Sequence, residues 1–85
     1  MAENIFEFKI VRTTSHEILM VEWIEVHSPN GNFVVSFDSS PIVSLLKYRG
    51  KIRYKEANSK KIESFDIYGG IFKVQKNKAI AILDL

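Results

Sequence analysis

The sequence has no cysteine, only two histidines and no long apolar run. Without cysteine, disulfides, thiolate zinc sites and thiol catalysis are all excluded. The longest apolar run is five residues, Ala79 to Leu83, whereas a transmembrane helix needs roughly 20. The segment Met1 to Glu7 has no basic region followed by an apolar one, so we expect no secretory signal. The fold must therefore be stabilised by side-chain packing.

The composition is that of an ordinary globular domain, with 46% hydrophobic and 26% charged residues. A chain of 85 residues has room for one core, so we predict a single domain over residues 1–85. The net charge of +2 hides an asymmetry. Residues 1–46 carry two basic and six acidic residues, whereas residues 47–85 carry ten basic and four acidic ones. Such a split suggests oriented contact with charged partners.

The dominant hydrophobic period is two, which is typical of β-strands. The segment 17–27 is apolar on both parities, with Glu22 interrupting one of them, so we expect both faces of this strand to be partly covered. A short apolar segment covers 42–46. The predicted strands cover 6–10, 17–27, 33–37, 47–55, 61–68, 71–76 and 79–85.

Turn-forming residues separate these segments about every 8–12 residues. Asn30-Gly31, between two alternating runs, is the clearest hairpin signal. Gly69-Gly70 indicates a bulge or a close backbone approach. No segment of ten or more residues carries helix caps. We therefore predict an all-β fold, an antiparallel β-sandwich of two sheets with about ten short strands.

The sequence has no recognisable catalytic or metal-binding pattern. His16 and His27 lie at strand ends beside polar residues, and we expect them to be solvated. Gly69-Gly70 is followed by neither a Lys-Ser/Thr pair nor a helix, so it is no phosphate-binding loop. No two glutamates are marked as an acid/base couple. We expect no catalytic residue, no cofactor, no metal site and no enzyme activity.

Lysines and arginines alternate with apolar and aromatic residues from Lys47 to Lys55. With Tyr48 and Tyr54, these cations could contact a phosphate backbone while the rings stack on bases. Strand parity, however, places the cations and the tyrosines on opposite faces. The alternative is a solvated basic face with the tyrosines packed inward, or a protein contact. We expect no nucleic-acid partner, and keep a small basic nucleic-acid-binding β-barrel as the alternative.

Several segments, in order, resemble the motifs of one known family. They are Phe8-Lys9-Ile10-Val11, Val21-Glu22-Trp23-Ile24-Glu25-Val26, Asn30-Gly31-Asn32-Phe33, Pro41-Ile42-Val43-Ser44-Leu45-Leu46, Gly50-Lys51-Ile52-Arg53, Tyr68-Gly69-Gly70-Ile71-Phe72-Lys73-Val74-Gln75 and Lys78-Ala79-Ile80-Ala81-Ile82-Leu83. Together they resemble the N-terminal β-sandwich domain of the epsilon subunit of F-type ATP synthases. The chain departs from the family in the loop Phe37-Asp38-Ser39-Ser40-Pro41, which keeps only the family's final proline.

The resemblance implies a non-catalytic rotor subunit of the central stalk, which docks on the gamma subunit and on the ring of c-subunits. It would help to couple proton or sodium flow to ATP synthesis. The implied gamma contacts are Arg12, Val43 and Ser44. The implied c-ring contacts are Asn30, Gly31, Asn32, Asp38, Ser39 and Ser40.

The family commonly adds a C-terminal helical hairpin that inhibits the motor and binds ATP in some members. We expect this chain to lack it, because the sequence ends after the last sandwich strand. The resemblance also implies a peripheral subunit at the cytoplasmic face of the inner membrane, or the equivalent matrix or stromal face. The isolated chain is expected to be a monomer. A diverged sandwich scaffold in another assembly is a further alternative, because of the altered loop.

Overall fold

The computed structural model describes residues 4–83, which form eight β-strands and no helix. Among these residues there is accordingly no helix that could cross a membrane. Glu3 and Asp84, which contribute to the charge asymmetry, lie outside the described residues. The strands are β1 (Phe6–Val11), β2 (His16–Ser28), β3 (Gly31–Ser36), β4 (Ile42–Leu45), β5 (Tyr48–Glu56), β6 (Ile62–Tyr68), β7 (Gly70–Gln75) and β8 (Lys78–Leu83).

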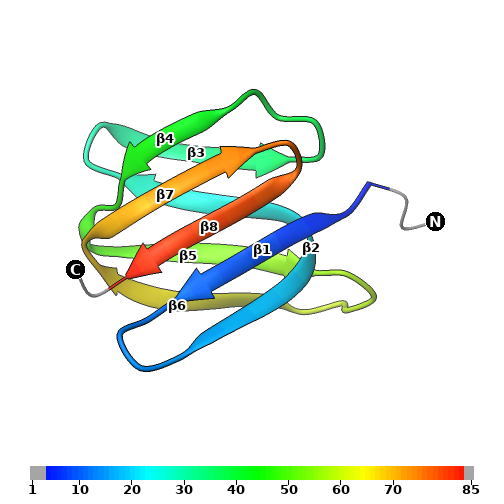
Figure 1. The fold of residues 1–85 in the computed structure, drawn as a ribbon, viewed down its shortest axis with the longest axis horizontal. Coiled ribbons are helices and arrows are strands. Elements are labelled where there is room, and N and C mark those ends of the chain that lie inside the picture. The colour runs from blue at the N-terminus through cyan, green and yellow to red at the C-terminus, as the bar shows by residue number, and fades with distance from the viewer. Residues whose placement is uncertain (1–3, 84–85) are drawn as a thin grey trace.

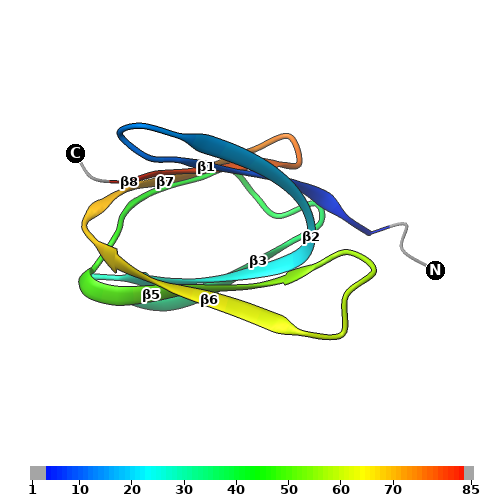
Figure 2. The same cartoon turned by 90° about the horizontal axis from the view of Figure 1, so that it is seen from below.

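The strands form two packed layers, which confirms the predicted all-β sandwich (Figures 1 and 2). One layer contains β4, β7, β8, β1 and the first half of β2, and the other contains β3, the second half of β2, β5 and β6. The details differ from the prediction in three respects. The described residues form eight strands rather than about ten, the layers are one continuous hydrogen-bonded sheet, and β1 pairs in parallel with β8.

Strand β2 joins the layers, and Figure 2 shows it curving from one to the other. Its first half pairs with β1, and its second half pairs with β3 and β5. The register with β5 shifts between Val21 and Trp23, so Glu22 is the extra residue of a β-bulge. The buried parity changes there, from Val21 before the bulge to Ile24 and Val26 after it. This change explains why core-facing apolar residues occur on both parities of the segment.

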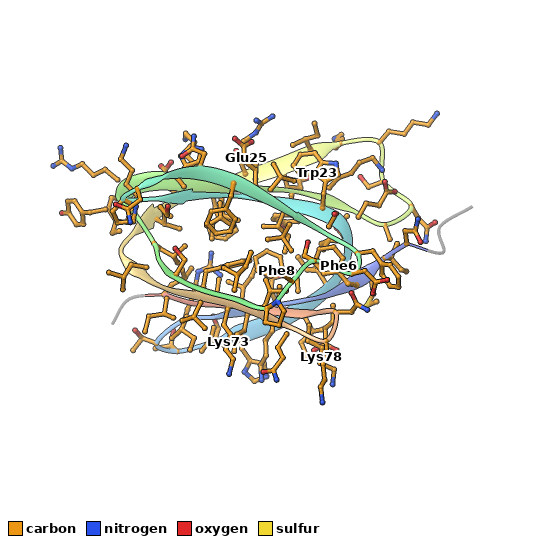
Figure 3. The ribbon with its side chains drawn as sticks, turned by 90° about the horizontal axis from the view of Figure 1, so that it is seen from above. Phe6, Phe8, Trp23, Glu25, Lys73 and Lys78 are labelled. Atoms are coloured by element: carbon orange, nitrogen blue, oxygen red, sulfur yellow. The ribbon has the colours of Figure 1, made fainter. Side chains whose placement is uncertain are left out.

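The buried apolar residues form one cluster between the layers. Figure 3 shows Phe6 and Phe8 pointing into this space. The Phe8 ring lies edge-on to Phe72, with centroids 6.4 Å apart, and to Tyr54 at 5.7 Å. These edge-to-face contacts join β1 and β7 in one layer to β5 in the other.

The predicted close backbone approach occurs at Gly70. A Cβ there would lie 2.2 Å from the carbonyl oxygen of Ile82, and the backbone has φ of +127°. Both conditions require glycine. Gly69 also has a positive φ, of +96°, but its Cβ position is unobstructed.

Candidate docking surface

The outward face of the layer formed by β4, β7, β8, β1 and the start of β2 is largely apolar. Cross-strand pairing aligns Leu45 with Ile71, Ile71 with Ile82, and Ile82 with Val11. Paired residues of neighbouring strands point to the same side of a sheet, so these side chains form one row. We call the apolar residues of this side the docking face, which comprises Val11, Ile18, Met20, Val43, Leu45, Ile71, Ile80 and Ile82.

Several docking-face side chains are strongly exposed. Val43 is 72% exposed, Leu45 64% and Ile18 54%. When one face of a sheet is in water, the residues alternate along each strand and those on the water-facing side are normally polar. A contiguous apolar patch that spans several strands marks a binding surface. The arrangement therefore suits contact with another macromolecule.

The same face also carries cations, since Lys73 lies between Val43 and Ile80, and Lys9 lies between Ile80 and Ile18. Lys9, Lys73, Lys76 and Lys78 line a shallow hollow of about 400 Å³, together with Glu7 and Gln75. In Figure 3, Lys73 and Lys78 point away from the core. Among residues 4–83, none of these lysines lies within ion-pair distance of a carboxylate. A partner on the docking face would therefore be favoured if it placed acidic groups over these lysines.

The three residues predicted to contact gamma do not lie together. Val43 lies on the docking face, opposite Lys73. Ser44 is opposite the buried Phe72 and so faces inward. The guanidinium of Arg12 lies 5.3 Å from the centroid of the Phe65 ring, toward the other layer. Only Val43 of the three belongs to the docking face.

The six residues predicted to contact the c-ring lie at opposite ends of β3. Asn30, Gly31 and Asn32 belong to the β2–β3 hairpin, and Asp38, Ser39 and Ser40 follow the far end of β3. The two groups are roughly 20 Å apart, because a strand rises about 3.3 Å per residue. The β3–β4 loop is instead attached to the β7–β8 turn, where the amide of Asp38 donates to Oδ1 of Asn77 at 2.8 Å.

The predicted parity of β5 holds from Lys51 to Lys55 but is wrong at Tyr48, because the register shift between Tyr48 and Gly50 places Tyr48 on the outward side, where it is 65% exposed. Acidic neighbours pair with three cations of this strand. Lys55 lies 2.8 Å from Glu22, Arg53 lies 2.7 Å from Glu25, and Lys51 lies 2.7 Å from Asp66. Two of these pairs, Glu22–Lys55 and Glu25–Arg53, join an acidic residue of the first half of the sequence to a basic residue of the second half. These pairs disfavour a phosphate-binding track along β5.

His27 has a structural role in addition to its partial exposure. Its Nδ1 accepts a hydrogen bond from the amide of Lys51 at 3.1 Å, and its carbonyl accepts one from the amide of Lys47 at 2.9 Å. The first bond identifies Nε2 as the protonated nitrogen of the neutral ring. In residues 4–83, no group of three histidine, aspartate or glutamate side chains is arranged to hold a metal ion.

Sequence reasoning did not identify the docking face, although a signal for it exists. In the segment Lys78 to Leu83, both parities are apolar after the lysine. Ala79, Ala81 and Leu83 fill the core, so Ile80 and Ile82 must point outward. An apolar strand with only one buried side thus indicates a covered or docking surface.

Comparisons with known proteins identify the fold. No protein-family model and no curated protein matches the sequence. The structure is similar to a chain in the Euglena gracilis mitochondrial ATP synthase structure of OSCP, F1 and c-ring, with a TM-score of 0.81 and 16% sequence identity. This match covers 89% of this chain and 48% of that chain. The structure is also similar to a chain in the Tetrahymena thermophila mitochondrial ATP synthase central stalk and c-ring structure, with a TM-score of 0.75 and 13% sequence identity.

The second match covers 91% of this chain and 61% of that chain. The protein thus spans about half to three-fifths of the length of these structural neighbours. At these identities the similarity shows the fold, a β-sandwich found in ATP synthase assemblies. The fold expected from the resemblance to the epsilon N-terminal domain is therefore confirmed.

Proposed function

We propose that this chain is a non-catalytic central-stalk subunit of an F-type ATP synthase, similar to the N-terminal domain of epsilon. In this proposal, residues 1–85 act as a single domain that docks on gamma and rests on the c-ring. It helps to couple proton or sodium flow to ATP synthesis, as a peripheral subunit on the cytoplasmic, matrix or stromal side of the membrane.

The observation that carries this proposal is the docking face on a sandwich of this fold. Its exposed aliphatic side chains, with Val43 and Leu45 foremost, provide apolar area for a stable partner. The lysines beside these residues would fix the orientation of that partner. We assign this face to gamma, since it contains Val43.

A rotor component must transmit force without deforming. A core at near-crystalline packing density resists deformation. Here one cluster of buried side chains joins both layers, and β2 connects them covalently and through hydrogen bonds on each side. A stiff body with separate contact surfaces is what this task requires.

The test is co-expression with a cognate gamma subunit, followed by size-exclusion chromatography at tens of micromolar. The wild-type chain should co-elute with gamma. Leu45→Asp should abolish co-elution, because a carboxylate would be placed in an apolar interface. Val34→Asp is the matched control, since Val34 is 62% exposed but lies in β3, in the other layer.

Persistent separation of the wild-type chain from gamma would overturn the proposal. If both variants co-elute with gamma equally well, the chain binds gamma but does not use the docking face to do so.

A further inference from the structure

An aromatic and cationic cluster lies at the end of the sandwich where β5 begins and β6 ends. The rings of Tyr48 and Tyr68 are edge-on to each other, with centroids 5.9 Å apart. The guanidinium carbon of Arg49 lies 5.7 Å from the Tyr48 centroid. Tyr48 is 65% exposed and Tyr68 60%, so these large rings are ordered against each other rather than buried in the core. We call these three residues the end cluster.

The backbone of Arg49 is strained. Its φ is +66°, in the left-handed region that glycine adopts more easily. The register with β6 shifts between Tyr48 and Gly50, so Arg49 is the extra residue of a bulge. Gly50 fills the tight position, where a Cβ would lie 2.9 Å from Cβ of His27. The bulge directs Arg49 away from the core at the cost of strain, a feature often found at functional positions.

The guanidinium of Arg49 lacks an ionic partner within the part of the chain that the structure describes. Arg49, Asp66 and Tyr68 line a hollow of about 360 Å³. The nearby carboxylate, Asp66, is engaged by Lys51 Nζ at 2.7 Å. Lys47, two residues before Arg49, is a second exposed cation. The local charge that faces a partner is therefore positive.

We propose that the end cluster binds a carboxylate-bearing segment of a partner protein, with Arg49 pairing to the carboxylate and the tyrosine rings packing against the flanking side chains. Tyrosine and arginine are the residues that most often dominate the energy of protein interfaces. A planar guanidinium held over a ring is also arranged for a bidentate contact with a carboxylate.

The geometry favours a protein over a nucleic acid. One face of Tyr48 is already occupied by Arg49, and its edge contact with Tyr68 limits stacking on a base. The next cations along β5, at Lys51, Arg53 and Lys55, are paired with carboxylates and offer no continuous track for phosphates.

This inference rests on the proposed function for the identity of the partner, which is the c-ring. The end cluster lies at the same end of the sandwich as the β2–β3 hairpin, because β2 and β5 are antiparallel and Val26 pairs with Ile52. Asn30 and Gly31 follow Val26, just as Tyr48 and Arg49 precede Ile52. The loop Asp38–Ser40, at the opposite end of β3, takes no part in this contact.

The test measures binding of the full chain to purified cognate c-rings, with gamma binding measured in parallel. Arg49→Glu should weaken ring binding by about tenfold or more, as expected for an interface hot spot, while gamma co-elution is unchanged. Lys60→Glu is the control, because it makes the same charge change at an exposed position in the β5–β6 loop.

A second variant separates binding from folding. Arg49→Gly should raise the melting temperature, since glycine tolerates the positive φ, yet it should also weaken ring binding. Amidation of the exposed carboxylates of the ring with a water-soluble carbodiimide and ethanolamine should reduce wild-type binding to the Arg49→Glu level.

The inference alone is overturned if Arg49→Glu binds the ring as well as Lys60→Glu does, or if amidated rings bind unchanged. Failure of the wild-type chain to bind the ring would overturn the inference together with the ring contact of the proposed function, and failure to bind gamma would overturn the gamma contact.

Discussion

At the scale of single residues, the surroundings of Gly70 and Tyr54 restrict most clearly which side chain or charge state each position accepts. Gly70 approaches the backbone of β8 so closely that no side chain fits. Tyr54 is half-buried between the rings of Phe8 and Phe65, and burial raises its pKa. The charges of Glu17, Glu63 and Glu56 raise the pKa of Tyr54 further, and Arg12 lowers it. Each of these features predicts a measurable effect.

Gly70→Ala should destabilise the protein strongly, because its Cβ would lie 2.2 Å from the Ile82 carbonyl oxygen at an unfavourable φ. We expect a loss of more than about 2 kcal/mol in the free energy of unfolding, measured by urea denaturation. Gly69→Ala would have the same unfavourable positive φ but no steric clash, so we expect a loss of about 1 kcal/mol in the free energy of unfolding. Equal losses would show that the close approach is absent.

Stability should fall at alkaline pH, partly because of Tyr54. A folded-state pKa raised above the unfolded value of about 10 stabilises the protein below that pH, and this stabilisation is lost as pH rises through the folded pKa. Tyr54→Phe keeps the ring contacts and removes the titrating group. Between about pH 9 and pH 11, urea denaturation should show a smaller loss of stability for Tyr54→Phe than for wild type. Parallel losses would refute this role.

At the scale of elements, β2 decides the architecture. Its 13 residues belong to both layers, and the bulge at Glu22 changes which parity faces the core. Without that extra residue, Ile24 and Val26 would point to solvent. The sandwich therefore depends on one residue that contributes no apolar side chain.

Deletion of Glu22 should prevent folding, whereas Glu22→Ala should fold. The substitution keeps the bulge and loses only the ion pair with Lys55, a change of at most about 1 kcal/mol. Circular dichroism and thermal melting would measure both variants. A folded deletion variant of near wild-type stability would contradict the parity argument.

Local patterns predicted most of the strands and turns but not their partners. Alternation and turn residues located the strands, the hairpin near Asn30-Gly31 and the close approach at Gly70. The hairpin turn itself is Pro29-Asn30, because Gly31 already pairs with Ser28. The parallel pairing of β1 with β8 joins residues about 70 positions apart, and no local pattern encodes such a contact. The bulges at Glu22 and Arg49 likewise follow from packing between strands.

The candidate site was predicted only in part for the same reason. Val43 was assigned to an interface through the family resemblance, and it does lie on the docking face. Ser44 is adjacent to Val43 in sequence but faces inward, opposite Phe72. Arg12 is remote in sequence, and its side chain lies toward Phe65 in the other layer. Which outward residues form one surface depends on the strand order, and this order became known only from the structure.

At the scale of the whole molecule, the sandwich has two surfaces of different chemistry. The docking face is aliphatic with lysines among its residues, and the end cluster is aromatic with a guanidinium that has no ionic partner in residues 4–83. A rigid core would let one body contact two partners together.

Hydroxyl-radical footprinting of the full chain, alone and in complex with cognate gamma, tests the central claim most directly. We expect the oxidation of Met20 and Leu45, on the docking face, to fall several-fold in the complex. Oxidation of Val34 and Ile62, exposed in β3 and β6, should stay unchanged. Protection of Val34 and Ile62, with Met20 and Leu45 still fully oxidised, would contradict the account.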